Sequence, residues 1–133
     1  MTKQIPDEYL DLFEKRIFAH LATLLPDGSP HLTPVWIDYD GQHLLVNTPQ
    51  GTQKDRNMQE RPSVAISIQD PDNPYRYLAV RGHVVVTTEA GAREHIEKQA
   101  QRYTGGAYAG PSGSRNLHKI TPDWIANVGY RRK

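Results

Sequence analysis

The sequence contains no cysteine among its 133 residues. Disulfide bonds, thiolate nucleophiles, iron–sulfur clusters and zinc sites built on cysteine are therefore excluded. No apolar run approaches the ~18 residues that a membrane-spanning helix needs, so we expect no membrane partner. The segment from Met1 to Glu8 holds one lysine and no apolar stretch, unlike a signal peptide, so we expect a cytoplasmic protein.

The chain also lacks a strong net charge. Its 16 Lys and Arg residues and 15 Asp and Glu residues give a formal net charge of +1. This near balance provides no bulk attraction to nucleic acid, so we expect no nucleic-acid partner. The length is that of one ordinary domain, and there is no linker or internal repeat, so we predict a single domain over residues 1–133.

Glycine and proline, with ten residues each, cluster between short apolar runs, which is typical of many short strands. Helical spacing and flanking residues predict helices over 6–15, 52–61 and 92–103. Apolar alternation and turn residues predict strands over 18–25, 31–39, 42–48, 63–69, 75–88, 116–120 and 123–131. Short turns join the first three strands, so we expect an antiparallel meander there. The predicted fold class is mainly β, with six or seven antiparallel strands that close into a small barrel and helices at its ends.

No catalytic motif is evident. The six histidines lie on separate predicted elements and form no HxxxH pair, so we predict no metal site. There is no GxSxG elbow, and Gly105-Gly106 lacks the spacing of a dinucleotide-binding or phosphate-binding loop. The residues thus indicate no protein nucleophile or general base, and we predict no catalytic residue.

One segment has the composition of a phosphate site. Between Asn47 and Asn57 a predicted strand ends, a glycine-containing turn follows, and a polar helix begins. Helix N-termini carry unpaired N–H groups and a partial positive charge, which together with Lys54 and Arg56 suit a phosphate. The alternative is a solvated surface helix on which both cations are idle, and the residues alone leave both interpretations open.

A second segment, from Thr33 to Trp36, places Pro34 inside a predicted strand. Proline removes a backbone donor, so this strand belongs at a sheet edge or at a bulge. Ordinary packing of the barrel accounts for Trp36 at this point.

Together these segments resemble the pyridoxamine 5′-phosphate oxidase-like split β-barrel superfamily. Within it, the chain is similar to the small flavin and deazaflavin oxidoreductases, the branch that often uses coenzyme F420. The resemblance rests on LATLLPDGSPHLTPVW at 21–36, LLVNTPQGTQKDRNMQERPSVAISI at 44–68, YLAVRGHVVV at 77–86 and ITPDWIANVG at 120–129.

The resemblance implies an FMN-binding-like split barrel that forms a homodimer, with two cofactor sites at the dimer interface. It also implies that a bound cofactor supplies the redox chemistry, while the protein orients it in a dry slot. The implied cofactor-binding positions are Thr33, Pro34, Val35 and Trp36 behind the tricyclic ring, Asn47 and Thr48 at its edge, and Thr52, Lys54, Arg56 and Asn57 around the phosphate.

The chain departs from the founding oxidase of the superfamily. HLTPVW at 31–36 stands where that oxidase has an Arg-x-Val-x-Leu-Lys strand. The oxidase's C-terminal Arg–His cluster has no counterpart before Arg131. We therefore do not expect oxidation of pyridoxamine phosphate.

The choice between FMN and F420 depends on charge. Both carry a phosphate near a tricycle, but F420 adds a lactyl and oligoglutamate tail, which suits a cationic groove. Candidates for that groove are Lys54, Arg56, Arg61, Arg131, Arg132 and Lys133. Together with the likeness of Pro34-Val35-Trp36 and Lys54-x-Arg56-Asn57 to the F420-using branch, these charges favour an F420-dependent enzyme that passes a hydride from reduced deazaflavin to a small conjugated acceptor such as an enone or a quinone. The alternatives are an FMN-binding reductase or oxidase of the same superfamily, and a non-catalytic flavin or deazaflavin carrier.

Overall fold

The computed structural model describes residues 3–128, and its framework is one antiparallel sheet. Within these residues the sheet has seven strands in the order β2-β1-β5-β6-β7-β4-β3. The strands are β1 (Phe18–Leu24), β2 (Pro30–Trp36), β3 (Asp38–Tyr39), β4 (Leu44–Pro49), β5 (Ser63–Asp70), β6 (Asn73–Thr88) and β7 (Arg115–Val128). The helices are the short 3-10 helix η1 (Asp7–Phe13), α1 (Gln53–Glu60) and α2 (Ala92–Thr104). The predicted class, a mainly β split barrel of antiparallel strands, is confirmed.

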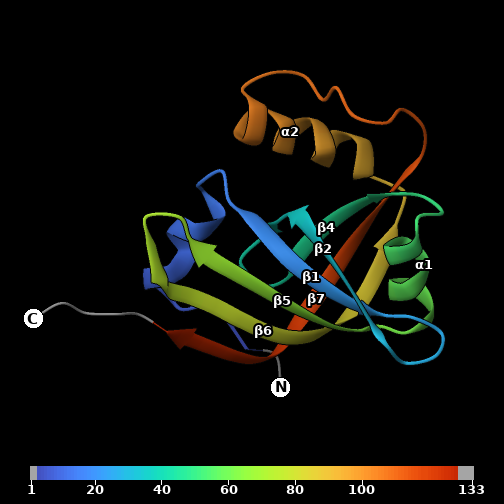
Figure 1. The fold of residues 1–133 in the computed structure, drawn as a ribbon. Coiled ribbons are helices and arrows are strands. Elements are labelled where there is room, and N and C mark those ends of the chain that lie inside the picture. The colour runs from blue at the N-terminus through green and yellow to red at the C-terminus, as the bar shows by residue number, and fades with distance from the viewer. Residues whose placement is uncertain (1–2, 129–133) are drawn as a thin grey trace, which may run out of the picture.

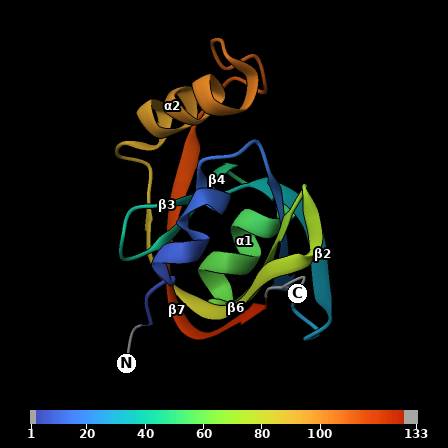
Figure 2. The same ribbon diagram turned by 90° about the vertical axis from the view of Figure 1, so that its left-hand side faces the viewer.

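The sheet curls into a barrel with helices at its ends (Figure 1). The helix η1 lies at one end and α1 at the opposite end. The helix α2 lies outside the barrel and above the strands, which Figure 2 shows from a second direction. No helix of the described chain is long and apolar enough to cross a membrane.

The predicted strand 31–39 is divided at Ile37, and this break separates the two edges of the sheet. β2 pairs with β1, whereas β3 pairs with β4 at the other edge. Ile37 is fully buried, its N–H donates to the Tyr103 hydroxyl (3.1 Å), and its carbonyl accepts from Arg102 Nη1 (2.7 Å). Because this backbone is bonded to α2, no strand continues through it. The predicted meander is therefore confirmed only in part: its antiparallel links are present as β1 with β2 and β3 with β4, but β2 and β3 lie at opposite edges and β4 also pairs with β7.

The core follows the alternation of the sequence. In β5, Val64, Ile66 and Ile68 are buried on the inner face, as their spacing predicts. The residues between them on the outer face are small, namely Ser63, Ala65 and Ser67. The inner face of β5 thus carries branched aliphatic side chains, while its outer face carries small ones from Ser63 to Ser67.

Gly82 marks an irregularity of β6, where the pairing register with β7 shifts after Arg81. A Cβ at Gly82 would overlap the carbonyl oxygen of Thr121, so no larger residue fits without a shift of β7. The last two predicted strands form the single strand β7, and positions 129–131 lie outside the described residues.

Candidate functional site

A cavity of about 210 Å³ lies where the two edges of the curled sheet approach each other. β2 is one edge of the sheet and β4 is next to the other edge, yet residues of both strands line this cavity. The remaining wall comes from α1, α2, the loop after α2 and the first residue of β7. The lining residues are Pro34, Val35, Trp36, Asn47, Thr48, Pro49, Lys54, Ile96, Tyr108 and Arg115.

Both strands have a free backbone edge beside this cavity. β2 pairs only with β1 in the described chain, and β3 pairs with β4 only at Leu44 and Leu45. From Val46 to Pro49, the side of β4 that faces away from β7 therefore has no strand partner among residues 3–128. Free peptide groups need hydrogen-bond partners, so these edges suit a flat ligand with polar atoms on its rim.

Trp36 forms a fixed aromatic wall of the cavity. Its indole stacks on the Tyr103 ring with centroids 4.7 Å apart and planes 4° apart. The Tyr103 hydroxyl donates to the Ile17 carbonyl (2.6 Å) and accepts from the Ile37 N–H, while burial raises the pKa of this phenol. Tyr108 meets the indole edge-on at 6.1 Å. The indole plane is therefore held before any ligand arrives.

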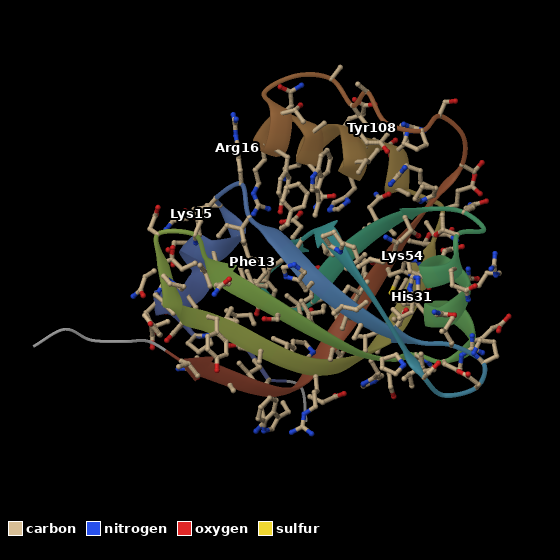
Figure 3. The ribbon with its side chains drawn as sticks, in the orientation of Figure 1. Phe13, Lys15, Arg16, His31, Lys54 and Tyr108 are labelled. Atoms are coloured by element: carbon tan, nitrogen blue, oxygen red, sulfur yellow. The ribbon has the colours of Figure 1, made fainter. Side chains whose placement is uncertain are left out.

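Lys54 brings a half-buried ammonium group to the cavity (Figure 3). Its Nζ donates to Thr33 Oγ1 (3.2 Å), and burial lowers the pKa of Lys54. Within residues 3–128, no carboxylate lies at ion-pair distance from this nitrogen. A cation that is partly removed from water without a counter-ion favours a bound anion.

Arg115 supplies a second cation from the start of β7. The residue is 6% exposed, and burial lowers the pKa of its guanidinium. Its Nε donates to Asn47 Oδ1 (2.6 Å) and its Nη1 donates to the Tyr108 hydroxyl (2.9 Å). These partners are neutral, and the described chain offers this guanidinium no carboxylate at ion-pair distance. The cavity thus combines two unpaired cations with an aromatic wall, which suits a flat anionic ligand.

Six of the ten predicted cofactor-binding residues line this cavity, namely Pro34, Val35, Trp36, Asn47, Thr48 and Lys54. Thr33 adjoins the cavity through its hydrogen bond to Lys54. Thr52 is the N-cap of α1, where its Oγ1 accepts from the backbone N–H of Asp55 (3.4 Å). The structure therefore brings the predicted ring-backing strand and the predicted helix start together.

Arg56 and Asn57 do not lie among the lining residues. Arg56 is exposed, and its guanidinium donates to the Gly51 carbonyl and to Gln53 Oε1 (3.0 Å). Asn57 is fully buried, and its Nδ2 donates to Thr23 Oγ1 (3.0 Å). Asn57 thus holds α1 against β1, whereas Arg56 bonds to the start of its own helix.

The predicted cationic groove for an anionic tail is only partly described. Arg61 Nε donates to the Leu24 carbonyl (2.8 Å), and its Nη1 contacts Glu60 Oε2 (3.0 Å). Arg131, Arg132 and Lys133 lie outside the described residues. Of the described candidates, Lys54 is the one that lines the cavity.

The sequence did not single out Pro49, Ile96, Tyr108 or Arg115 as site residues. Arg115 and Asn47 are 68 residues apart in the chain, and their contact depends on the pairing of β4 with β7. Tyr108 lies in a segment rich in glycine and serine, which predicts a flexible loop. Residue spacing carries no signal for either contact.

A buried hydrogen-bonded pair, His118 and Asp55, lies beneath the start of α1. His118 is fully buried and its Nε2 lies 2.9 Å from Oδ1 of Asp55, which is 2% exposed. Burial lowers the pKa of His118. Burial alone would raise the pKa of Asp55, but hydrogen bonds from Asn116, Gly51 and Thr48 lower it overall. This pair ties the turn before α1 to β4 and β7. Within residues 3–128, no three His, Asp or Glu side chains are placed to hold a metal ion.

Comparison with known proteins agrees with this architecture. The sequence profile of the pyridoxamine 5′-phosphate oxidase family matches residues 5–129. A solved structure named F420 reductase is 35% identical, with a TM-score of 0.81, over 92% of this chain and 98% of that chain. Among curated proteins, no sequence matches the chain.

Two further solved structures are less similar in sequence. The conserved hypothetical protein Rv2991 from Mycobacterium tuberculosis is 24% identical, with a TM-score of 0.77, over 96% of this chain and 86% of that chain. HupZ from Group A Streptococcus is 22% identical, with a TM-score of 0.69, over 92% of this chain and 93% of that chain. At such identities the likeness shows the fold alone.

Proposed function

The chain belongs to the pyridoxamine 5′-phosphate oxidase family of flavin-binding oxidoreductases, and on this premise we propose that it is an F420-dependent oxidoreductase. When bound, the reduced deazaflavin supplies a hydride to a small conjugated acceptor such as an enone or a quinone. The observation that carries the proposal is the pair of cations without a carboxylate partner, half-buried Lys54 and buried Arg115, on one cavity with the Trp36 indole. The 35% identity to a structure named F420 reductase supports the deazaflavin over FMN.

In this proposal each part of the cavity has a role. Lys54 and Thr33 bind the cofactor phosphate, and Thr52 holds the start of α1 beside them. The strand from Pro34 to Trp36 backs the tricycle, and the edge of β4 at Asn47 bonds its polar rim. The site fits the cofactor because both the charge and the flat aromatic wall are present in one place.

Titration of the purified protein with F420 and with FMN tests the proposal. The chain has two tryptophans, so Trp124→Phe leaves Trp36 as the fluorescent reporter beside the cavity. Lys54→Ala removes a charge-assisted contact of about 1.5–3 kcal/mol, which weakens F420 binding about ten- to one-hundred-fold. Lys98→Ala, at an exposed position of α2, is the matched control and leaves the affinity unchanged.

The outcomes of this titration separate the alternatives. Micromolar FMN binding without F420 binding would make the protein an FMN-binding reductase or oxidase. A bound cofactor with no turnover of enones, quinones or nitro compounds would make it a carrier. If Lys54→Ala binds F420 as tightly as the parent, Lys54 does not bind the phosphate.

We also propose that the protein is a homodimer with its cofactor sites at the interface. The cavity of about 210 Å³ is smaller than the roughly 300–1,000 Å³ of typical ligand sites, which is expected when a partner subunit completes the site. The outer face of the sheet supports such a partner. Across it runs a cross-strand row of Leu32, Ala22, Ala65, Arg81 and Trp124.

Two large apolar side chains of this row are open to solvent, since Leu32 is 65% exposed and Trp124 is 43% exposed. Pro34 also belongs to β2 and lines the cavity, so the row and the cavity share one strand. We expect Leu32→Glu to convert the dimer to a monomer in light scattering and to weaken F420 binding as well. A parent protein that is monomeric at all concentrations would contradict this proposal. A cytoplasmic location stays a prediction.

A further inference from the structure

The loop between α2 and β7, residues 105–114, contributes Tyr108 to the cavity. This residue is held from several sides. Its backbone N–H donates to Glu97 Oε1 (3.0 Å), and its phenol oxygen accepts from Arg115 Nη1 (2.9 Å). Its ring lies 5.0 Å from the Arg115 guanidinium and 5.9 Å from that of Arg93. Tyr108 is therefore fixed at the cavity wall, although its loop has a flexible composition.

Gly110 makes room for this phenol. A Cβ on Gly110 would overlap both the hydroxyl and the ring of Tyr108. Any larger residue at position 110 would displace the phenol or the loop. The glycine at this position thus preserves the place of the hydroxyl group.

The directions of the hydrogen bonds leave the Tyr108 proton available. A guanidinium can only donate, so the phenol oxygen accepts from Arg115 and its own hydrogen points elsewhere. Among residues 3–128, no acceptor bonds to that hydrogen. The hydroxyl of Thr48, which also lines the cavity, instead donates to Asp55 Oδ1 (3.1 Å). Lys54 carries a proton too, but its place beside Thr33 assigns it to the phosphate.

We propose, on the basis of the proposed function, that Tyr108 is a catalytic residue that donates its proton to the oxygen of the conjugated acceptor. When a hydride adds to the β-carbon, the electron pair of the C=C bond shifts toward the carbonyl oxygen. The Tyr108 O–H bond breaks, and a new O–H bond forms on the product. The Arg115 guanidinium stabilises the phenolate that remains, which then takes a proton from water. The hydride and the proton together complete the two-electron reduction.

Tyr108→Phe tests this step, because it removes the hydroxyl and keeps the ring. We expect the variant to bind F420 within about twofold of the parent and to reduce menadione, a planar quinone, about 10²–10⁴-fold more slowly. Gly110→Ala retains the hydroxyl but displaces it, so it also slows the reaction. Ser112→Ala, at an exposed position of the same loop, is the control and retains the parent rate.

A second measurement does not depend on turnover. The probe is 4-nitrophenolate, a flat oxyanion that resembles the charge formed on the acceptor. In phosphate buffer, where inorganic phosphate competes at Lys54, we expect the parent to bind this probe about tenfold more tightly than Tyr108→Phe does. A shift in the visible absorbance of the probe reports binding.

The two measurements separate the two proposals. Equal probe affinity and equal menadione rates in Tyr108→Phe and the parent would overturn the role of Tyr108. In that case F420 binding and turnover by the parent would leave the proposed function standing. Failure of the parent to bind F420 would overturn the proposed function, while the probe affinity would still decide whether Tyr108 donates to an oxyanion.

Discussion

Besides the strand β2 with Trp36, the cavity has two walls that the chain assembles in different ways. One, which we call the α1 wall, comes from a single stretch in which β4 ends at Asn47 to Pro49 and α1 then presents Lys54. The other, the α2 wall, consists of Ile96, Tyr108 and Arg115, which come from a helix, a loop and a strand. In Figure 3 the labelled Lys54 lies by α1, and the labelled Tyr108 lies by α2. The α1 wall is built from residues that are close together in the sequence, whereas the α2 wall forms only when α2 packs over the barrel.

Asn47 joins the two walls. Its Oδ1 accepts from Arg115, which can only donate, so the orientation of the amide is set. Its Nδ2 then donates to the Ala92 carbonyl (2.8 Å) and to His95 Nδ1 (3.1 Å). One amide on the α1 wall thus holds α2 and Arg115 in place. The contiguous α1 wall therefore depends on Arg115, which is 68 positions from Asn47 in the chain.

We expect the largest effect from Arg115→Met, because this change removes the cation of the α2 wall and leaves Asn47 Oδ1 without its donor. We expect the free energy of unfolding to fall by about 1–3 kcal/mol in urea denaturation. Arg93→Met is the matched control, since the Arg93 side chain is 45% exposed, and its change should stay within about 0.5 kcal/mol. Equal losses in the two variants would contradict the joining role of Arg115.

A smaller effect concerns the buried pair beneath the α1 wall. Burial lowers the pKa of His118 below its ordinary value of 6.5, so the native protein keeps this imidazole neutral where the unfolded chain binds a proton. Stability is therefore lost as the pH falls below about 6.5. We expect the free energy of unfolding to drop less between about pH 7.5 and pH 5.5 in His118→Gln than in the parent. Urea denaturation at both pH values measures this, and identical drops would refute it.

The smallest expected effect is that of Arg56, which we compare with Lys54 on the same helix. Arg56 is exposed and bonded to its own helix start, so Arg56→Ala should change F420 affinity by less than about threefold and stability by less than about 0.5 kcal/mol. Fluorescence titration beside Lys54→Ala measures the difference. A loss as large as that of Lys54→Ala would place the phosphate at the helix N-terminus, where both cations could reach it.

Local patterns predicted much of the fold. The alternation of Val64, Ile66 and Ile68 predicted β5, and the polar stretch 52–61 predicted α1. The break at Ile37 was not predicted, because this residue is apolar and suggests that the strand continues. Its backbone bonds to Tyr103 and Arg102 of α2, and no local pattern encodes those partners.

The candidate site, like the fold, was predictable from the sequence only in part. Lys54 stands out as a cation just after a strand end, although the residues alone left a solvated surface helix open, and Trp36 gained its predicted role only from the family resemblance. Asn57 carries an equally suggestive side chain, yet the fold buries it against Thr23. Tyr108 and Arg115 have no such local signal, since each gains its role from a neighbour on another element.

Local sequence patterns account for the β class, the positions of most strands and the helix α1, because alternation and turns act between residues a few positions apart. Only the tertiary structure decided the break at Ile37, the pairing of β4 with β7 and the α2 wall. The hydrogen bonds behind these features join residues 66 and 68 positions apart, from Ile37 to Tyr103 and from Asn47 to Arg115. Such bonds form only where the curled sheet and α2 bring buried polar groups together, since those groups must find partners away from water.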